Sequence, residues 1–231
     1  SPHPEGSKTI DRKDVNGTRL LDTIHSPADV KRLDFGQLQE LCAEIRAFLI
    51  DSVSKTGGHL SSNLGTIELT VALHKVFATP SDKFVWDVGH QCYTHKMLTG
   101  RADQMNTLRK LGGLSGFPKP HESRSDAFIA GHASNSVSVA LGMARARTQL
   151  GEDYRVVALI GDGALTGGLA YEGLSDAGQS GEKLLVILND NGMSIRKNVG
   201  GIAKLLARQH LGEGYLKFKR GYGSLMHTIP G

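Results

Sequence analysis

The sequence predicts an α/β fold in which a doubly wound, mostly parallel sheet carries helices on both of its faces. Two apolar runs, 156–160 and 184–188, have the length and continuous hydrophobicity of strands buried on both sides. Segments with helical spacing of apolar residues alternate with these runs, which is the βαβ pattern of parallel sheets. At 231 residues and 39% hydrophobic content, the chain is long enough for one domain with a substantial core.

In the first half of the chain, the expected elements follow from periodicity and from Gly and Pro. Apolar residues recur at helical spacing over 35–54, and Gly57 and Gly58 end that helix. A second helix covers about 66–78 and stops before Pro80, which cannot continue it. The remaining expectations here are a short strand at 84–87, a helix at 101–112 and a loop with two prolines at 112–125.

In the second half, a brief apolar segment at 128–130 is expected to be a strand that ends where a Gly-containing loop begins. A helix is expected from about 137 to 151, because its apolar residues keep the helical period and Gly151 follows them. The last elements alternate in type: a strand at 155–160, a helix at 168–179, a strand at 184–189 and a final helix at 203–220.

Composition limits the organisation and the class of function. Residues 1–19 are polar and are predicted to be a tail or a tag remnant. Residues 20–206 are predicted to form the folded domain, and residues 207–231 a linker-like segment. The net charge of +4 comes from scattered basic residues, so no nucleic-acid partner is expected. The apolar runs are far too short for a membrane span, and without a visible signal peptide we expect a cytoplasmic protein. The two cysteines indicate neither a disulfide framework nor a zinc site.

Four Gly-containing loops follow the apolar runs and are expected at one edge of the sheet. Ligands bind beyond the carboxyl ends of strands in open α/β sheets, and helix starts there offer N–H groups and a positive dipole end to a diphosphate. The loops begin at Asp87–His90, Ala130–Ser134, Ile160–Gly163 and Leu188–Asn191, the last of which continues into Gly192.

Two of these loops carry the oxygen ligands of a hard cation. Gly161-Asp162-Gly163 follows one strand, and Asn189-Asp190-Asn191 follows the next. A carboxylate, an amide oxygen and a backbone carbonyl suit Mg²⁺, which takes its other ligands from phosphate and water. Gly-Asp-Gly by itself is more often a turn. The metal hypothesis therefore depends on the pairing of the two loops at adjacent strand ends.

Two histidines are candidates for chemistry. His59 follows a Gly-Gly loop, precedes a helix start and has a pKa suited to proton transfer near neutrality. A lone histidine of this kind is more often structural. His90 follows a strand, where it could contact a ligand. The alternative is a purely structural role, a hydrogen bond at a helix N-terminus. Ser134 is either a hydroxyl for the ligand or a helix cap. Lys119 is interpreted as a solvated loop side chain, and six further histidines as surface or core residues: His25, His74, His95, His121, His210 and His227.

Several segments resemble the 1-deoxy-D-xylulose-5-phosphate synthase family, a branch of the transketolase-like thiamine diphosphate enzymes. The Gly161-Asp162-Gly163 and Asn189-Asp190-Asn191 pair matches the thiamine diphosphate motif, and the likeness runs from about residue 20 to 206. The other segments that carry it are Leu21–Asp29, Gly58–Gly65, Thr66–His74, Trp86–Gln91, Gly131–Ser134 and Val186–Ile195.

The resemblance implies thiamine diphosphate and Mg²⁺ as cofactors. The side chains of Asp162 and Asn191 and the carbonyl of Met193 would hold the metal. His59 would move protons on substrate oxygens. The expected cofactor contacts are His90, Gly131, His132, Ala133, Gly163, Ala164 and Asn191. Two departures from the family pattern are Ala133, where Ser is frequent, and Gly192, where Glu is frequent.

The reaction implied by the resemblance joins pyruvate to glyceraldehyde 3-phosphate with loss of CO₂, for isoprenoid, thiamine and pyridoxal phosphate biosynthesis. Family members are longer homodimers, so pyrimidine-binding and C-terminal domains, or a partner subunit carrying them, would be missing. The fragment alone is expected to be inactive. Two alternatives stay open: the N-terminal subunit of a split transketolase, and a non-catalytic cofactor-binding module.

Overall fold

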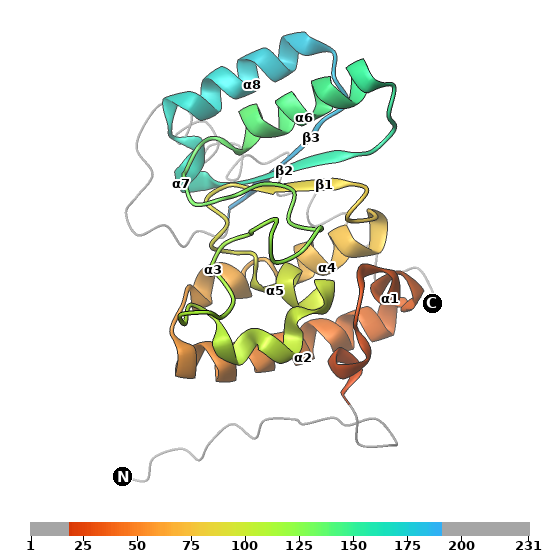
Figure 1. The fold of residues 1–231 in the computed structure, drawn as a ribbon, viewed down its shortest axis with the longest axis vertical. Coiled ribbons are helices and arrows are strands. Elements are labelled where there is room, and N and C mark those ends of the chain that lie inside the picture. The colour runs from red at the N-terminus through yellow and green to blue at the C-terminus, as the bar shows by residue number, and fades with distance from the viewer. Residues whose placement is uncertain (1–18, 191–231) are drawn as a thin grey trace, which may run out of the picture.

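A three-stranded parallel sheet lies between two layers of helices in the computed structural model, which describes residues 19–190 (Figure 1). The strands are β1 (Lys83–Trp86), β2 (Val156–Gly161) and β3 (Leu185–Asn189), in the spatial order β1-β2-β3. The register pairs Trp86 with Leu159 and Gly161 with Asn189. Because all pairs are parallel, the carboxyl ends of the strands meet at one edge of the sheet.

The layer below the sheet in Figure 1 is built around α2 (Phe35–Thr56). Asp34 caps this helix by accepting from the Gln37 N–H, and Gln37 bonds back to the Asp34 N–H in a capping box. Gly57 ends it with a φ of +75°, which glycine adopts without strain. The other elements of this layer are η1 (Leu20–Thr23), α1 (Pro27–Arg32), α3 (Leu60–Leu64), α4 (Ile67–Val76), α5 (Tyr93–Lys96), the π-helical turn η2 (Met97–Arg101) and the 3₁₀ helix η3 (Ala102–Thr107).

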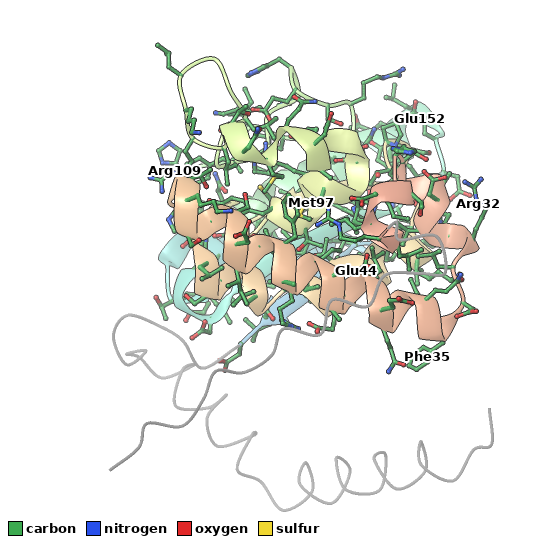
Figure 2. The ribbon with its side chains drawn as sticks, turned by 90° about the horizontal axis from the view of Figure 1, so that it is seen from below. Arg32, Phe35, Glu44, Met97, Arg109 and Glu152 are labelled. Atoms are coloured by element: carbon green, nitrogen blue, oxygen red, sulfur yellow. The ribbon has the colours of Figure 1, made fainter. Side chains whose placement is uncertain are left out.

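Figure 2 looks onto this layer from below, with α2 in front. Glu44, near the middle of α2, accepts hydrogen bonds from the N–H groups of Leu20 and Leu21 at 3.0 and 2.6 Å. Arg109 lies toward one end of the layer in the same view. Within residues 19–190, none of the helices is long and apolar enough to span a lipid bilayer.

The upper layer consists of α6 (Ser136–Leu150), α7 (Asp162–Leu165) and α8 (Gly168–Ser180). The side chains of β2 alternate between the layers. Val157 and Leu159 join the lower core, whereas Val156, Ala158 and Ile160 pack with α6 and α8. The continuous apolar run of β2 is therefore explained by burial on both faces. The predicted doubly wound parallel sheet with helices on both faces is confirmed.

Most predicted elements are confirmed with ends shifted by one to three residues, but two predictions are wrong. The helix expected over 101–112 is replaced by η3, and the helical residues lie earlier, at 93–101. Residues 91–98 are all buried, so they carry no amphipathic period by which to find a helix. The segment 128–130 is not a strand, and Ile129 is 59% exposed. The predicted tail, linker and 203–220 helix lie wholly or largely outside the described residues.

Candidate functional site

The loop that follows β1 is tied to the loop at 131–136 by a buried carboxylate. Asp87 is 1% exposed, and its two oxygens accept from the N–H groups of Ser134 at 2.8 Å and Ser136 at 3.0 Å. The N–H of Val88 donates to the carbonyl of His132 at 3.2 Å. Val88 and Ser134 both have positive φ angles, 57° and 71°, which non-glycine residues rarely adopt. The fold therefore holds these two loops together at the strand-end edge, as the sequence predicted.

Ser134 joins a third loop to this pair. Its hydroxyl donates to the carbonyl of Ala164 in α7 at 2.6 Å. The residue that caps α6 is Asn135, and its side chain makes no capping bond. Ser134 is thus not the helix cap, which was one of the two alternatives that the sequence left open; its hydroxyl proton is used by Ala164, and its oxygen can still accept a hydrogen bond. It connects the 131–136 loop to the turn that carries Asp162.

The two halves of the predicted metal motif follow adjacent strand ends. Gly161 and Asn189 are register partners, so Asp162 and Asp190 directly follow neighbouring positions of the sheet. Asp162 is partly exposed at the start of α7. Asn191 and Met193, the other proposed ligands, lie outside the described residues. Among residues 19–190 there is no cluster of three His, Cys, Asp or Glu side chains arranged for a metal ion.

His59 and His90 face each other. Their ring centroids lie 5.2 Å apart with an edge-to-face angle of 70°. His59 is exposed at the N-terminus of α3, with the Phe117 ring centroid at 6.5 Å. The Nδ1 atom of His90 is buried and has no hydrogen-bond partner within the described part of the chain. A buried polar atom of this kind is costly unless something binds it, which fits a ligand contact at His90.

A fully buried asparagine fixes the backbone of both histidines. Asn63 has 0% exposure, and its amide nitrogen donates to the carbonyls of His59 at 2.7 Å and His90 at 2.8 Å. Its oxygen accepts from the N–H of Tyr93 at 2.9 Å. Sequence reasoning assigned no role to Asn63. The only available signal was a polar side chain between Leu60 and Leu64, which does not reveal a contact with residue 90.

The environment keeps both imidazoles neutral near pH 7. Burial lowers the pKa of His59, and the positive charge of Arg109 lowers it further. Burial also lowers the pKa of His90, as does His59, while the carboxylate of Asp87 opposes this shift. A neutral imidazole can accept a proton, so the pair is suited to proton transfer at neutral pH. Arg109 is a contributor that the sequence did not single out, because 50 residues separate it from His59.

We predict that Arg109→Gln raises the pKa of His59 toward its ordinary value. The substitution removes a positive charge that disfavours the imidazolium form, and the effect is reduced by salt because both side chains are exposed. An NMR pH titration of the His59 ring protons measures it. The exposed Lys110→Gln variant is the control for a change in net charge. An unchanged His59 titration in Arg109→Gln would contradict this account of the site.

The remaining predicted contacts line an open face of the same edge. Gly131, His132, Ala133 and Gly163 are exposed, and Ala164 is partly exposed. A Cβ atom built on Gly131 or Gly163 would meet no atom within 4 Å. These residues are therefore accessible to a ligand, which is the condition that the predicted contacts require.

Comparison with known proteins points to one family. A family model described as 1-deoxy-D-xylulose-5-phosphate synthase matches residues 21–230. A 1-deoxy-D-xylulose-5-phosphate synthase of Dechloromonas aromatica is 60% identical over 194 residues, 84% of this chain and 31% of that protein. One of Thiobacillus denitrificans is 57% identical over 211 residues, 91% of this chain and 34% of that protein. The chain thus spans about a third of the length of these relatives.

Proposed function

The chain belongs to the 1-deoxy-D-xylulose-5-phosphate synthase family, and from this premise we propose that it is the cofactor-binding domain of a transketolase-class enzyme. The whole enzyme would condense pyruvate with glyceraldehyde 3-phosphate and release CO₂, for isoprenoid, thiamine and pyridoxal phosphate biosynthesis. The observation that carries the proposal is the register of β2 and β3, which pairs Gly161 with Asn189, so that Asp162 and Asp190 directly follow neighbouring positions at one edge of the sheet. The family match favours this activity over that of a split transketolase.

The proposed cofactors are thiamine diphosphate and Mg²⁺. The side chains of Asp162 and Asn191, with the carbonyl of Met193, would hold the metal against the diphosphate. The chemistry of the described donor fits: a carboxylate oxygen at a strand end is a ligand that Mg²⁺ prefers. The first N–H groups of a helix have no partner within it, so those of Gly163 and Ala164 in α7 suit phosphate oxygens. Gly131, His132 and Ala133 would line the cofactor on the neighbouring loop.

Bound thiamine diphosphate would supply the electron sink that decarboxylation needs. The chain itself would position groups and move protons. His59, exposed and neutral, would exchange protons with substrate oxygens. His90 would use its buried, unpartnered Nδ1 to contact the cofactor. The Asn63 hydrogen bonds hold the backbones of His59 and His90 at a fixed spacing, which would reduce the entropy lost when a ligand binds.

The partners follow from the proposed assembly. The pyrimidine-binding and C-terminal domains, in the same polypeptide or on a partner subunit, would complete the site, and the whole enzyme would be a cytoplasmic homodimer. Within this chain we propose residues 20–206 as the domain, 1–19 as a tail and 207–231 as a linker-like segment. The 231-residue chain alone would bind the cofactor weakly and turn over nothing.

Calorimetry tests cofactor binding. Titration of thiamine diphosphate into the 231-residue chain should release heat with Mg²⁺ present and none with a chelator. Absence of heat even at millimolar cofactor would instead favour a module that has lost its ligand. Reconstitution with the missing domains, fed either pyruvate plus glyceraldehyde 3-phosphate or a ketose phosphate donor, separates the two enzyme classes. Steady product formation by the isolated chain would refute its proposed inactivity.

A further inference from the structure

A buried cluster of charges lies beside the site and is used by nothing described above. It consists of Lys96 and Arg101 with the carboxylates of Glu122 and Asp126, extended by His95. The Lys96 and Asp126 side chains are 0% exposed, that of Arg101 5% and that of Glu122 11%. Burying ionised groups costs free energy that their mutual attraction only partly repays. Such a cluster therefore contributes little to stability by itself, and its hydrogen bonds indicate another role.

Asp126 accepts hydrogen bonds from a cation, a histidine and the loop backbone. Its Oδ1 accepts from Arg101 at 2.8 Å and lies 3.1 Å from Nε2 of His95. Its Oδ2 accepts from Arg101 at 2.9 Å and from the backbone N–H of Lys119 at 2.7 Å. His95 in turn lies 2.9 Å from His74 through their ring nitrogens. Asp126 therefore ties the backbone at residue 119 to the buried helical turns α5 and η2.

Glu122 repeats the arrangement four residues earlier. One oxygen accepts from Lys96 and, at 3.3 Å, from Arg101. The other accepts from the backbone N–H of Ser115 at 2.7 Å. The two carboxylates thus hold the chain at residues 115 and 119, and both also accept hydrogen bonds from the buried Arg101.

The three residues between these anchors make up the 116–118 segment, and they contact the site. The Phe117 ring lies 6.5 Å from the His59 ring. Pro118 lies against Gly89, where a Cβ atom would come within 2.6 Å of its Cδ. Gly116 packs beside the Tyr93 hydroxyl, which accepts from the His59 N–H at 3.4 Å. Any shift of residues 115 or 119 would therefore move the 116–118 segment relative to His59 and His90.

We propose that Glu122 and Asp126 are positioning residues of the candidate cofactor site, holding the 116–118 segment against the His59–His90 pair. This inference rests on the proposed function for its consequence in binding, and on the contacts above for its geometry. The cluster is buried and pairs two cations with two carboxylates. Salt and water screen buried ion pairs much less than exposed ones, so the contacts that hold the loop should be insensitive to ionic strength.

The test is Glu122→Gln, because the change keeps the size of the side chain and removes its charge. Its matched control is Glu182→Gln. Glu182 is 13% exposed and pairs with the buried Arg147 at 2.9 Å, but it precedes β3 at the opposite sheet edge. Each variant removes one part-buried carboxylate from an arginine, and Glu122→Gln also removes it from the buried Lys96, so urea unfolding should show the larger loss of stability for Glu122→Gln. Glu122→Asp, which keeps the charge, replaces Glu122→Gln if the latter does not fold.

Two readouts separate positioning from plain stability. In NMR spectra of the cofactor-free chain, Glu122→Gln should shift the His59 ring signals, because the nearby Phe117 ring moves. Phe117→Leu, which leaves the cluster intact, should shift the same signals, whereas Glu182→Gln should not. In calorimetry, Glu122→Gln should raise the dissociation constant for Mg²⁺–thiamine diphosphate about tenfold, as loss of a supporting contact typically does.

Each outcome decides one of the two proposals. His59 signals unmoved in Glu122→Gln, or moved equally in Glu182→Gln, would overturn the positioning role. A dissociation constant within twofold of wild type, with stability reduced, would do the same. If the wild-type chain binds no cofactor, the proposed function fails. The His59 signals would still report whether Glu122 and Asp126 hold the 116–118 segment in position.

Discussion

Replacing Asp162 with alanine should raise the dissociation constant for Mg²⁺–thiamine diphosphate by about 100-fold or more. Asp162 is the only carboxylate among the three proposed metal ligands, and a lost charged contact of about 2–3 kcal/mol corresponds to this factor. Asp162 directly follows Gly161, and the register partner of Gly161 is Asn189, the first residue of the second half of the motif. Asp162→Asn keeps the shape and one oxygen of the side chain but loses the charge. Its dissociation constant should therefore lie between those of the wild type and of Asp162→Ala.

Calorimetry at saturating Mg²⁺ measures this effect on the 231-residue chain and on an enzyme reconstituted with the missing domains. Asp153→Ala is the control, because Asp153 is 91% exposed and precedes β2 at the opposite edge of the sheet. It removes the same charge from the chain and should leave the dissociation constant unchanged. Asp162→Ala binding within threefold of wild type would remove the metal hypothesis, and with it the central support for the proposed function.

Replacing Asp87 with alanine should lower the free energy of unfolding by about 2–5 kcal/mol. The substitution leaves the buried N–H groups of Ser134 and Ser136 without an acceptor, and each such donor costs about 1–3 kcal/mol. It also frees the loop that carries Gly131, His132 and Ala133. Cofactor binding should weaken together with stability. Urea unfolding, with the slope checked for two-state behaviour, gives the change.

Asp82 provides a close control for this prediction. Its carboxylate also accepts two backbone N–H groups, from Ala78 at 2.6 Å and Arg155 at 2.7 Å, but in an exposed setting. Water can replace the lost acceptor there, so Asp82→Ala should cost about 1 kcal/mol or less. If the two variants lost the same stability, burial would not be the reason for the importance of Asp87.

Some elements could be predicted because their causes lie within a few residues of one another. The α2 helix is specified by Asp34 and Gln37 at its start and by Gly57 at its end. β2 and β3 are specified by runs of apolar side chains. By contrast, residues 93–98 gave no pattern because burial is uniform around that helix, and the apolar segment at 128–130 proved to be loop.

The candidate site divides in the same way. The residue types in three loops, above all Asp162, His59 and His90, were sufficient to propose a candidate ligand site. Sequence reasoning did not single out four residues around the candidate site: Asn63, Arg109, Glu122 and Asp126. Each looks ordinary in the sequence, and Asp87 stood out only as the start of a loop. Their roles depend on which groups, distant along the chain, the fold brings next to them.

The sequence by itself determined the fold class, the edge of the sheet that carries the candidate ligands and the chemistry of those ligands, since periodicity, caps and strand-end motifs are local properties. Only the tertiary structure decided which buried polar groups are paired. Asn63 meets His90 across 27 residues, and Ser134 meets Asp87 across 47. A hydrogen bond forms only when folding brings donor and acceptor to within about 3 Å, and no spacing along the chain records that distance.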